Sequence, residues 1–475
     1  MSNLRIGCTG QRPVHLFQKR VGPLAALMLG AAVLVAAAPA SAQAPAPVPA
    51  AAPAATQPAA SQTVADFYRL RNGAPLWLTP QAGDAAEQLI SLLSTASIDG
   101  LNSSKYQPAV LETELQTALK KNKRKDVQRA DEALSEAFVA YVDDLHQDPG
   151  VGVTYVDPQL RPVPPSPLAA LLQAAAAPSL SDYVTQIGWM HPFYGQLRKA
   201  LAQHQYSDDH ARELLEINLQ RARALPSGKQ RYVLVNAAEQ RLYMYEDGKP
   251  VDSMVVVVGQ PKWQTPMLTA YIRYAALNPY WYVPSDLAWE DVGQYVVKDP
   301  KYFDRLGYEE VSDWSKDAQI LDPKKIDWKG VHDGTVQVLL RQKPGPENFM
   351  GRIKFMFPNQ FGVYLHDNPR RALFEKSVRY FSGGCVRLED AWRLSKWLFH
   401  RDLTWEGAGT EEPVMLDQPV PVYITYLTAR PDGQSIAYYD DAYGRDKAML
   451  AKMEGTTETE AGSAALSASA SSGNK

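Results

Sequence analysis

The chain has 475 residues, of which 45% are hydrophobic, 10% aromatic and 21% charged. This composition is typical of a globular protein with about two to four domains. Its net charge of −3 argues against the basic surface of a nucleic-acid-binding protein, and its two cysteines exclude a disulfide framework or a cysteine-rich zinc site.

The first predicted element is an export signal. Four basic residues and no acidic residue come before an apolar, Ala-rich stretch over residues 21–39, which ends at the small-residue cleavage signal Ala40-Ser41-Ala42. This pattern predicts a secretory signal peptide over residues 1–42, with an uncleaved membrane anchor as the alternative. Cleavage removes four cations and no anion, so the net charge becomes −7, and no later stretch is long enough to span a membrane.

Cleavage would also remove Cys8, which leaves Cys385 as the remaining thiol of an exported protein. A single cysteine cannot form an internal disulfide in an oxidising compartment. Cys385 therefore either packs as a small apolar residue or reacts.

The next segments are a linker and a helical region. Residues 43–61 are rich in proline and alanine and carry no charge, which predicts an extended linker. Residues 62–228 show apolar residues at helical spacing, most clearly at 86–93, 126–145, 193–203 and 208–224. The histidine, aspartate and glutamate residues of this region do not show the spacing of metal ligands, so we expect the region to be a scaffold.

A β-rich region follows from about residue 231. Runs at 232–235, 241–245 and 251–259 predict strands, and Asp247-Gly248 predicts a hairpin turn between the last two. Further strands are expected at 268–277, 336–341, 352–357 and 361–366, and a helix at 388–400. Residues 285–333 interrupt the strands and predict a lid or binding loop, or surface elaboration. Residues 455–475 predict a disordered tail.

Cys385 lies in the sequence Ser382-Gly383-Gly384-Cys385-Val386-Arg387. Two glycines before a thiol allow a tight turn, whose backbone N–H groups can stabilise an oxyanion. A helix expected just after Arg387 would place the thiol near a helix N-terminus. Together with the guanidinium, this predicts a depressed pKa for Cys385.

His366 is the candidate general base. It ends a β-like run, lies 19 residues before the cysteine and is followed by Asp367-Asn368-Pro369. Taken alone it could be an exposed turn histidine. The combination of a lone exported thiol, a Gly-Gly-Cys turn and a histidine at a strand end favours a catalytic pair. The later His400 falls in the same predicted helix and is a poor candidate.

These motifs, together with Phe355-Met356-Phe357-Pro358-Asn359 and Tyr364-Leu365-His366, resemble L,D-transpeptidases of the YkuD fold. Arg341-Gln342-Lys343-Pro344-Gly345-Pro346, Asn278-Pro279-Tyr280-Trp281 and Phe67-Tyr68-Arg69 resemble their large periplasmic branch. The resemblance implies an α+β protein with a helical N-terminal scaffold domain. A YkuD-like β-sandwich catalytic domain follows, with an inserted capping subdomain. The implied boundaries are 62–228 for the scaffold, 229–430 for the catalytic domain and 285–345 for the cap.

The resemblance also implies a mechanism. Cys385 attacks a stem tetrapeptide of peptidoglycan, terminal D-alanine leaves, and a second stem resolves the thioester to give a 3→3 cross-link. His366 moves the proton, the Asp367 carbonyl orients the imidazole, and the Gly383-Gly384 turn with the amides of Gly384 and Cys385 holds the oxyanion. The implied substrate-binding residues are Arg387, Ser382 and Tyr364.

Two departures from the family pattern stand out. Many members carry a second histidine where this chain has Gly383, so His366 is the sole base, and Asn368 stands where many have threonine. Residues 150–225 also leave too little chain for a complete peptidoglycan-binding module.

Alternative functions share the same site. A water acceptor would make the protein an L,D-carboxypeptidase or endopeptidase, and a protein lysine would make it a lipoprotein-anchoring enzyme. A non-catalytic wall-binding scaffold predicts an unreactive Cys385. No metal or organic cofactor and no nucleic-acid partner is expected, and the implied location is the periplasm.

Overall fold

The computed structural model describes residues 63–315, 317–404 and 411–453. The predicted signal peptide, the linker and the tail lie outside these residues. None of the helices described has the length and apolar character needed to cross a membrane.

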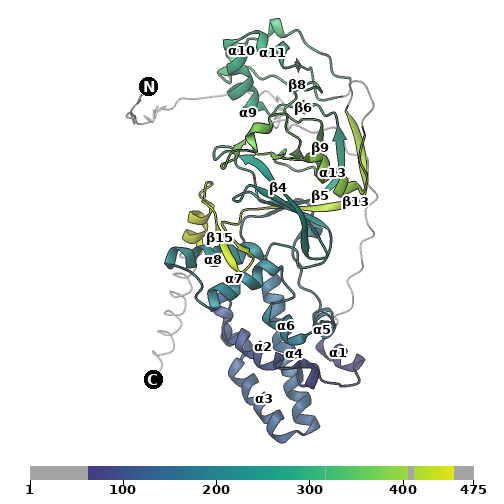
Figure 1. Cartoon of the computed structure of the whole chain (residues 1–475), viewed down its shortest axis with the longest axis vertical. Helices are drawn as coiled ribbons and strands as arrows, with labels where there is room; N and C mark the ends of the chain where they lie inside the picture. The colour runs from purple at the N-terminus through teal and green to yellow at the C-terminus, as the bar shows by residue number, and fades with distance from the viewer. Residues whose placement is uncertain (1–62, 316, 405–410, 454–475) are drawn as a thin grey trace, which may run out of the picture. The chain divides into compact units, whose positions relative to one another are not determined.

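The region before residue 223 is helical, as the apolar spacing predicts (Figure 1). Its helices bury their apolar stripes in one cluster that includes Leu89, Phe138 and Leu197. The four predicted helices are confirmed as α2, α4, α7 and α8. The helices are α1 Val64–Leu70, α2 Ala85–Ser94, α3 Pro108–Lys121, α4 Arg124–His146, α5 Pro167–Ala175, α6 Leu180–Thr185, α7 Pro192–Ala202 and α8 Asp209–Ala222, with 3₁₀ turns at Pro80–Ala82, Ala96–Asp99, Ser103–Tyr106 and Pro158–Leu160.

The β-rich region is one sheet that closes on itself. Its strand order runs β5-β13-β2-β3-β4-β12-β10-β9, and β9 pairs again with β5. The expected sandwich is therefore a continuous sheet around one apolar core, with β1 on β5 and β11 on β4. The strands are β1 Thr154–Tyr155, β2 Tyr232–Asn236, β3 Arg241–Glu246, β4 Lys249–Gly259, β5 Leu268–Leu277, β9 Ile353–Met356, β10 Leu365–His366, β11 Tyr380–Ser382, β12 Val386–Leu388 and β13 Glu412–Thr425.

The predicted hairpin is confirmed. Asp247 and Gly248 join β3 to β4 with φ of +50° and +75°, the left-handed pair that a two-residue hairpin turn needs. A second hairpin, β14 Ala429–Asp432 with β15 Ser435–Tyr438, follows β13.

The insertion between β5 and β9 has an apolar core of its own, which includes Val292, Phe303 and Leu340. Figure 1 shows its short helices beside its strands. The expected strand at 336–341 is reduced here to β8. The elements are β6 Trp281–Tyr282, α9 Ser285–Leu287, a π-helical turn Ala288–Gly293, α10 Gln294–Lys298, α11 Lys301–Arg305, β7 Tyr308–Glu310, a 3₁₀ turn Pro323–Lys325, α12 Trp328–His332 and β8 Leu340–Gln342. The predicted cap and domain boundaries stay predictions.

Two predicted elements around the nucleophile are wrong in extent. The strand expected at 361–366 is only β10, because Asn359 turns the chain before it through hydrogen bonds to residues 357, 361 and 363. The helix expected from residue 388 is α13 Ala391–Phe399, which begins after its N-cap Asp390. Strand β12 occupies the intervening residues, so Cys385 precedes a strand rather than a helix.

Candidate active site

Strand register brings the residues predicted for catalysis to one face of the sheet. β10 runs parallel to β12 with His366 opposite Arg387, and antiparallel to β9 with His366 opposite Lys354. The neighbouring Leu365 and Val386 are fully buried in the apolar core. Because side chains alternate along a strand, His366, Arg387 and Lys354 lie on the opposite face.

Tyr364 and Cys385 belong to the same face. They stand two positions before His366 and Arg387, and the amide of Val386 donates to the carbonyl of Tyr364 at 3.0 Å. This bond continues the β10–β12 ladder one step back, so the same alternation applies to both residues. The β10–β12 ladder thus presents the thiol and the imidazole on the same face of the sheet.

His366 is a neutral, oriented imidazole. Its side chain is buried, and Nδ1–H donates to the carbonyl of Asp367 at 2.6 Å. Burial lowers the pKa of His366 to about 3, helped by the positive charge of Arg387 and opposed by the carbonyls of Asp367 and Met350. The ring therefore carries its lone pair on Nε2, as a general base requires.

The Asp367 side chain turns away from the imidazole. Its carboxylate accepts the amide of Arg352 at 3.0 Å and a guanidinium N–H of Arg371 at 2.9 Å. Asp367 therefore meets His366 only through its backbone carbonyl. The resemblance to L,D-transpeptidases implies this carbonyl contact, and the orienting role of the carbonyl stays a prediction.

The Cys385 thiol departs from expectation. It is partly accessible, and its S–H donates to the carbonyl of Gly362, with Sγ 3.7 Å from the oxygen, rather than to His366. The dense protein around it raises its pKa, which the Tyr364 backbone and the positive charges of Arg387 and Lys354 only partly oppose. The predicted depression of this pKa is wrong because burial outweighs the nearby cations, and the expected helix N-terminus is a strand.

The Gly-Gly turn has the predicted tight geometry. Gly384 has φ of +112°, a conformation that side-chain-bearing residues rarely adopt. Ser382 closes the turn, because its hydroxyl accepts the Gly384 N–H at 3.1 Å and donates to the Cys385 carbonyl at 2.5 Å. Ser382 is 1% exposed and holds the turn together, and the substrate contact predicted for it stays a prediction.

The turn also changes the candidates for an oxyanion hole. The Gly384 N–H donates to the Ser382 hydroxyl in this structure, and its use as an oxyanion donor stays a prediction. Within the described ranges, the amides of Gly383 and Cys385 donate to no protein acceptor. A Cβ at residue 383 would lie 3.0 Å from Leu287 Cδ1, so the insertion borders the turn.

Charged residues that the sequence analysis missed surround this face. The buried Lys354 donates to Glu411 at 3.1 Å and to the Tyr280 carbonyl at 3.2 Å. Burial raises the pKa of Asp291 from the insertion, against the positive charges of Arg370 and Arg387. The sequence does contain a signal for Lys354, because a single lysine inside the apolar run Ile353–Met356 indicates a buried cation.

The positive charge of Arg387 acts on both Asp291 and Cys385. Its Nε is buried and has no hydrogen-bond partner among the residues described. A guanidinium nitrogen left unpaired beside a thiol can receive an anionic group. No set of three or more histidine, cysteine, aspartate or glutamate side chains suited to a metal ion occurs in the described parts of the chain.

Comparisons with known families agree with the two-part architecture. The model of the L,D-transpeptidase catalytic domain, YkuD, matches residues 230–424, and the Scaffold domain model matches residues 62–201. A curated Haemophilus influenzae protein named "Putative L,D-transpeptidase" is 28% identical over 288 residues, which are 58% of this chain and 57% of that protein. The match thus spans little more than half of this relative.

Solved structures give weaker matches. An L,D-transpeptidase from Mycobacterium smegmatis is 15% identical over 41% of this chain and 58% of its own, with a TM-score of 0.20. The catalytic domain of an E. faecium L,D-transpeptidase is 14% identical over 41% of this chain and 97% of its own, with a TM-score of 0.19. Superpositions at such scores carry no argument about this chain.

Proposed function

The chain carries a YkuD-family L,D-transpeptidase catalytic domain behind a Scaffold domain, and on this premise we propose that it cross-links peptidoglycan stem peptides through Cys385. The observation that carries the proposal is the shared face of β10 and β12. It presents a thiol, a neutral imidazole and a glycine turn with two unengaged amides. These are the parts that acyl transfer through a thioester needs.

The proposed reaction begins on a donor stem tetrapeptide. The Cys385 sulfur bonds to the carbonyl carbon of the third residue while its proton passes to Nε2 of His366. The bond to terminal D-alanine then breaks, and its nitrogen takes that proton. The amine of an acceptor stem attacks the thioester, frees the thiol and forms the 3→3 cross-link.

The charges on the site suit this chemistry. In the resting enzyme the thiol and the imidazole are both neutral, because burial opposes charge on each of them. The proton moves as the thiol attacks, and Arg387 offers its unpaired Nε to the developing charge or to a carboxylate of the substrate. The amides of Gly383 and Cys385 are the proposed oxyanion donors.

We propose that the segment over residues 285–345 covers this cleft as a cap. Leu287 contacts the glycine turn, and Asp291 shares its electrostatic environment with Arg387. The features of residues 1–42 support export to the periplasm, where peptidoglycan stems are accessible, and a role in cell-wall biogenesis and cell shape.

The test is the intact mass of the protein after incubation with a disaccharide tetrapeptide. We expect the wild type to gain the mass of the donor stem without D-alanine, and Cys385→Ala to gain nothing. His366→Gln should accumulate the adduct at least about 100-fold more slowly, since a general base contributes that much. A folded wild type that forms no adduct would overturn the proposal.

The products then identify the acceptor. A cross-linked dimer supports transpeptidation, whereas a tripeptide with free D-alanine indicates that water resolves the thioester. A tripeptide without any dimer, at high acceptor concentration, would contradict the proposed cross-linking and favour the carboxypeptidase alternative.

A further inference from the structure

The carbonyl of Gly384 is held by a buried threonine from outside the nucleophile turn. Thr265 lies in the loop between β4 and β5 and is fully buried. Its hydroxyl donates to the Gly384 carbonyl at 2.8 Å and accepts the Gly259 N–H at 2.9 Å. The hydroxyl thus uses its single proton on the turn that carries Cys385.

The hydrogen bond from Thr265 to the Gly384 carbonyl affects the Cys385 N–H, which is a proposed oxyanion donor. The carbonyl of Gly384 and the N–H of Cys385 belong to one peptide group, which is planar. Fixing the direction of the carbonyl therefore fixes the direction of the N–H, which points the opposite way. Thr265 therefore fixes the direction of the Cys385 N–H bond, although its own side chain does not contact the substrate.

The loop that supplies Thr265 is itself joined to the turn. Gly259 is the register partner of Ser382 in the β4–β11 pair, and the amide of Gln260 donates to the Ser382 carbonyl at 3.0 Å. A Cβ at residue 259 would lie 2.0 Å from the carbonyl oxygen of Trp263, so only glycine fits this tight loop. Loop and turn form one hydrogen-bonded unit.

A segment near the end of the described chain closes this unit. The hydroxyl of Tyr443 donates to the Gly259 carbonyl at 2.6 Å and accepts the Thr265 N–H at 3.4 Å. The Arg445 guanidinium donates to the Thr265 carbonyl at 2.8 Å and lies 4.8 Å from the centre of the Tyr443 ring. Both residues follow residue 424, where the match to the catalytic-domain family ends.

The same segment is anchored to the helical region. Asp446 forms a buried ion pair with Arg221 of α8, and the Tyr443 ring stacks on Tyr426 with centroids 5.1 Å apart. Asn218 of α8 also donates to the Thr428 hydroxyl at 2.9 Å. The position of the segment therefore depends on α8.

We propose that Tyr443 and Arg445 are positioning residues for acyl transfer, which act through Thr265 on the amide of Cys385. This rests on the proposed function. A helix of the N-terminal region thereby supports the nucleophile turn through the C-terminal segment, although none of these side chains reaches the reacting atoms.

The test compares Thr265→Val, Thr265→Ser and Tyr443→Phe in the full chain, with Tyr438→Phe as the matched control because its side chain is 42% exposed on β15. We expect kcat for disaccharide tetrapeptide to fall about 100-fold in Thr265→Val and about 10-fold in Tyr443→Phe, since small misplacements of catalytic groups cost that much. KM should stay within about twofold, because substrate contacts are unchanged. Thr265→Ser keeps the hydroxyl and should retain wild-type kcat.

A second readout does not depend on the substrate. Amide hydrogen exchange at Gly384 and Val386, whose N–H groups are hydrogen-bonded, should become faster in Thr265→Val and Tyr443→Phe but not in Tyr438→Phe. Unchanged exchange in both variants would overturn the positioning role. If the wild type consumes no tetrapeptide while exchange still rises, the proposed function fails and the support of the turn stands.

Discussion

At the residue scale, the electrostatic environment of Cys385 differs most from expectation. The sequence predicts two groups that would stabilise the thiolate, a helix N-terminus and the guanidinium of Arg387. The structure keeps the guanidinium, replaces the helix by β12 and adds Lys354, yet burial outweighs both cations and raises the pKa of Cys385 above its ordinary value. Reactivity then depends on transfer of the proton to His366 during attack rather than on a preformed thiolate.

Lys354 is predicted to be one of the two cations that limit this rise, beside Arg387. Lys354→Met removes a buried positive charge from the face that carries the thiol, so the pKa of Cys385 should rise further. The measurement is the rate of iodoacetamide alkylation of Cys385 against pH, with Cys385→Ala as background. The midpoint should lie above that of an ordinary cysteine in the wild type and move further upward in Lys354→Met.

Two controls separate charge from folding. Lys354→Met leaves Glu411 without its cation, so Lys354→Met with Glu411→Gln should recover stability while keeping the upward shift of the midpoint. Lys396→Met, which removes an exposed lysine paired with Asp402, should leave the midpoint unchanged. An unchanged midpoint in both Lys354 variants would show that this ammonium does not act on the thiol.

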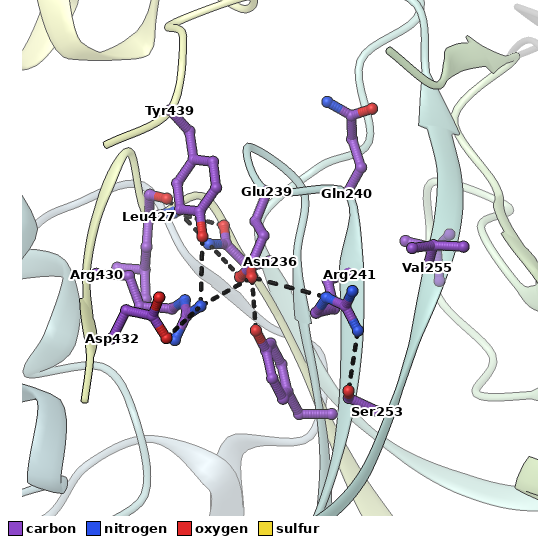
Figure 2. Close-up of polar contacts among 12 residues, drawn as sticks. Asn236, Glu239, Gln240, Arg241, Ser253, Val255, Leu427, Arg430, Asp432 and Tyr439 are labelled. Carbon is purple, nitrogen blue, oxygen red and sulfur yellow. Dashed lines mark hydrogen bonds and ion pairs between the residues drawn. The ribbon is translucent and has the colours of Figure 1, made fainter. Parts of the chain in front are cut away.

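At the element scale, a buried ionic cluster joins the turn between β2 and β3 to the β14–β15 hairpin. Glu239, in the turn between β2 and β3, accepts Arg430 Nη2 at 3.0 Å and the Tyr243 hydroxyl at 2.5 Å. Figure 2 shows Arg430 and Tyr439 directed toward this carboxylate from β14 and the chain after β15. The side chains of Glu239 and Arg430 are 7% and 12% exposed, so neither is well solvated if its partner is lost.

Arg430→Met is therefore predicted to destabilise the fold strongly. It leaves the buried Glu239 carboxylate with only the longer 3.9 Å ion pair to Arg241, so the loss should approach the cost of breaking a buried pair, about 3–5 kcal/mol of unfolding free energy. Urea unfolding measures this loss of unfolding free energy. The double variant Arg430→Met with Glu239→Gln should recover most of the lost stability. The matched control is Arg393→Met, whose exposed pair with Asp252 should contribute no more than about 1 kcal/mol. Equal losses for the two arginines would contradict this account.

At the scale of the whole molecule, buried neutral histidines make folding sensitive to acid. His191 caps α7 by accepting the Phe193 N–H at 3.1 Å, and it lies 3.0 Å from the Tyr232 hydroxyl of β2. Burial lowers the pKa of His191 to about 3, and His366 behaves in the same way. An unfolded histidine takes up a proton near pH 6.5, so the stabilisation is present above that pH and is lost as the pH falls toward 3.

Proton uptake on unfolding measures this effect. At pH 5 the unfolded chain binds a proton at His191 that the folded chain does not bind, so His191→Asn should take up about one proton fewer than the wild type on unfolding in urea. Asparagine can still accept the Phe193 amide as an N-cap. Equal uptake by the two proteins would show that His191 is already charged in the folded state.

The sequence alone predicted the features that depend on local pattern. Helical periodicity located α2, α4, α7 and α8, and Asp247-Gly248 predicted the β3–β4 hairpin, because spacing of apolar side chains and left-handed turn residues act over a few neighbours. The motif around Cys385 also indicated its family, which the domain matches support.

The tertiary structure decided everything that depends on contacts between distant residues. Only strand register shows that Lys354 of β9 shares a face with His366, and only packing shows that burial raises the pKa of Cys385. Likewise, Thr265 meets Gly384 across a separation of 119 residues, and Tyr443 meets Gly259 across a separation of 184. Hydrogen bonds and desolvation are short-range in space but unrestricted along the chain, so no local pattern encodes them.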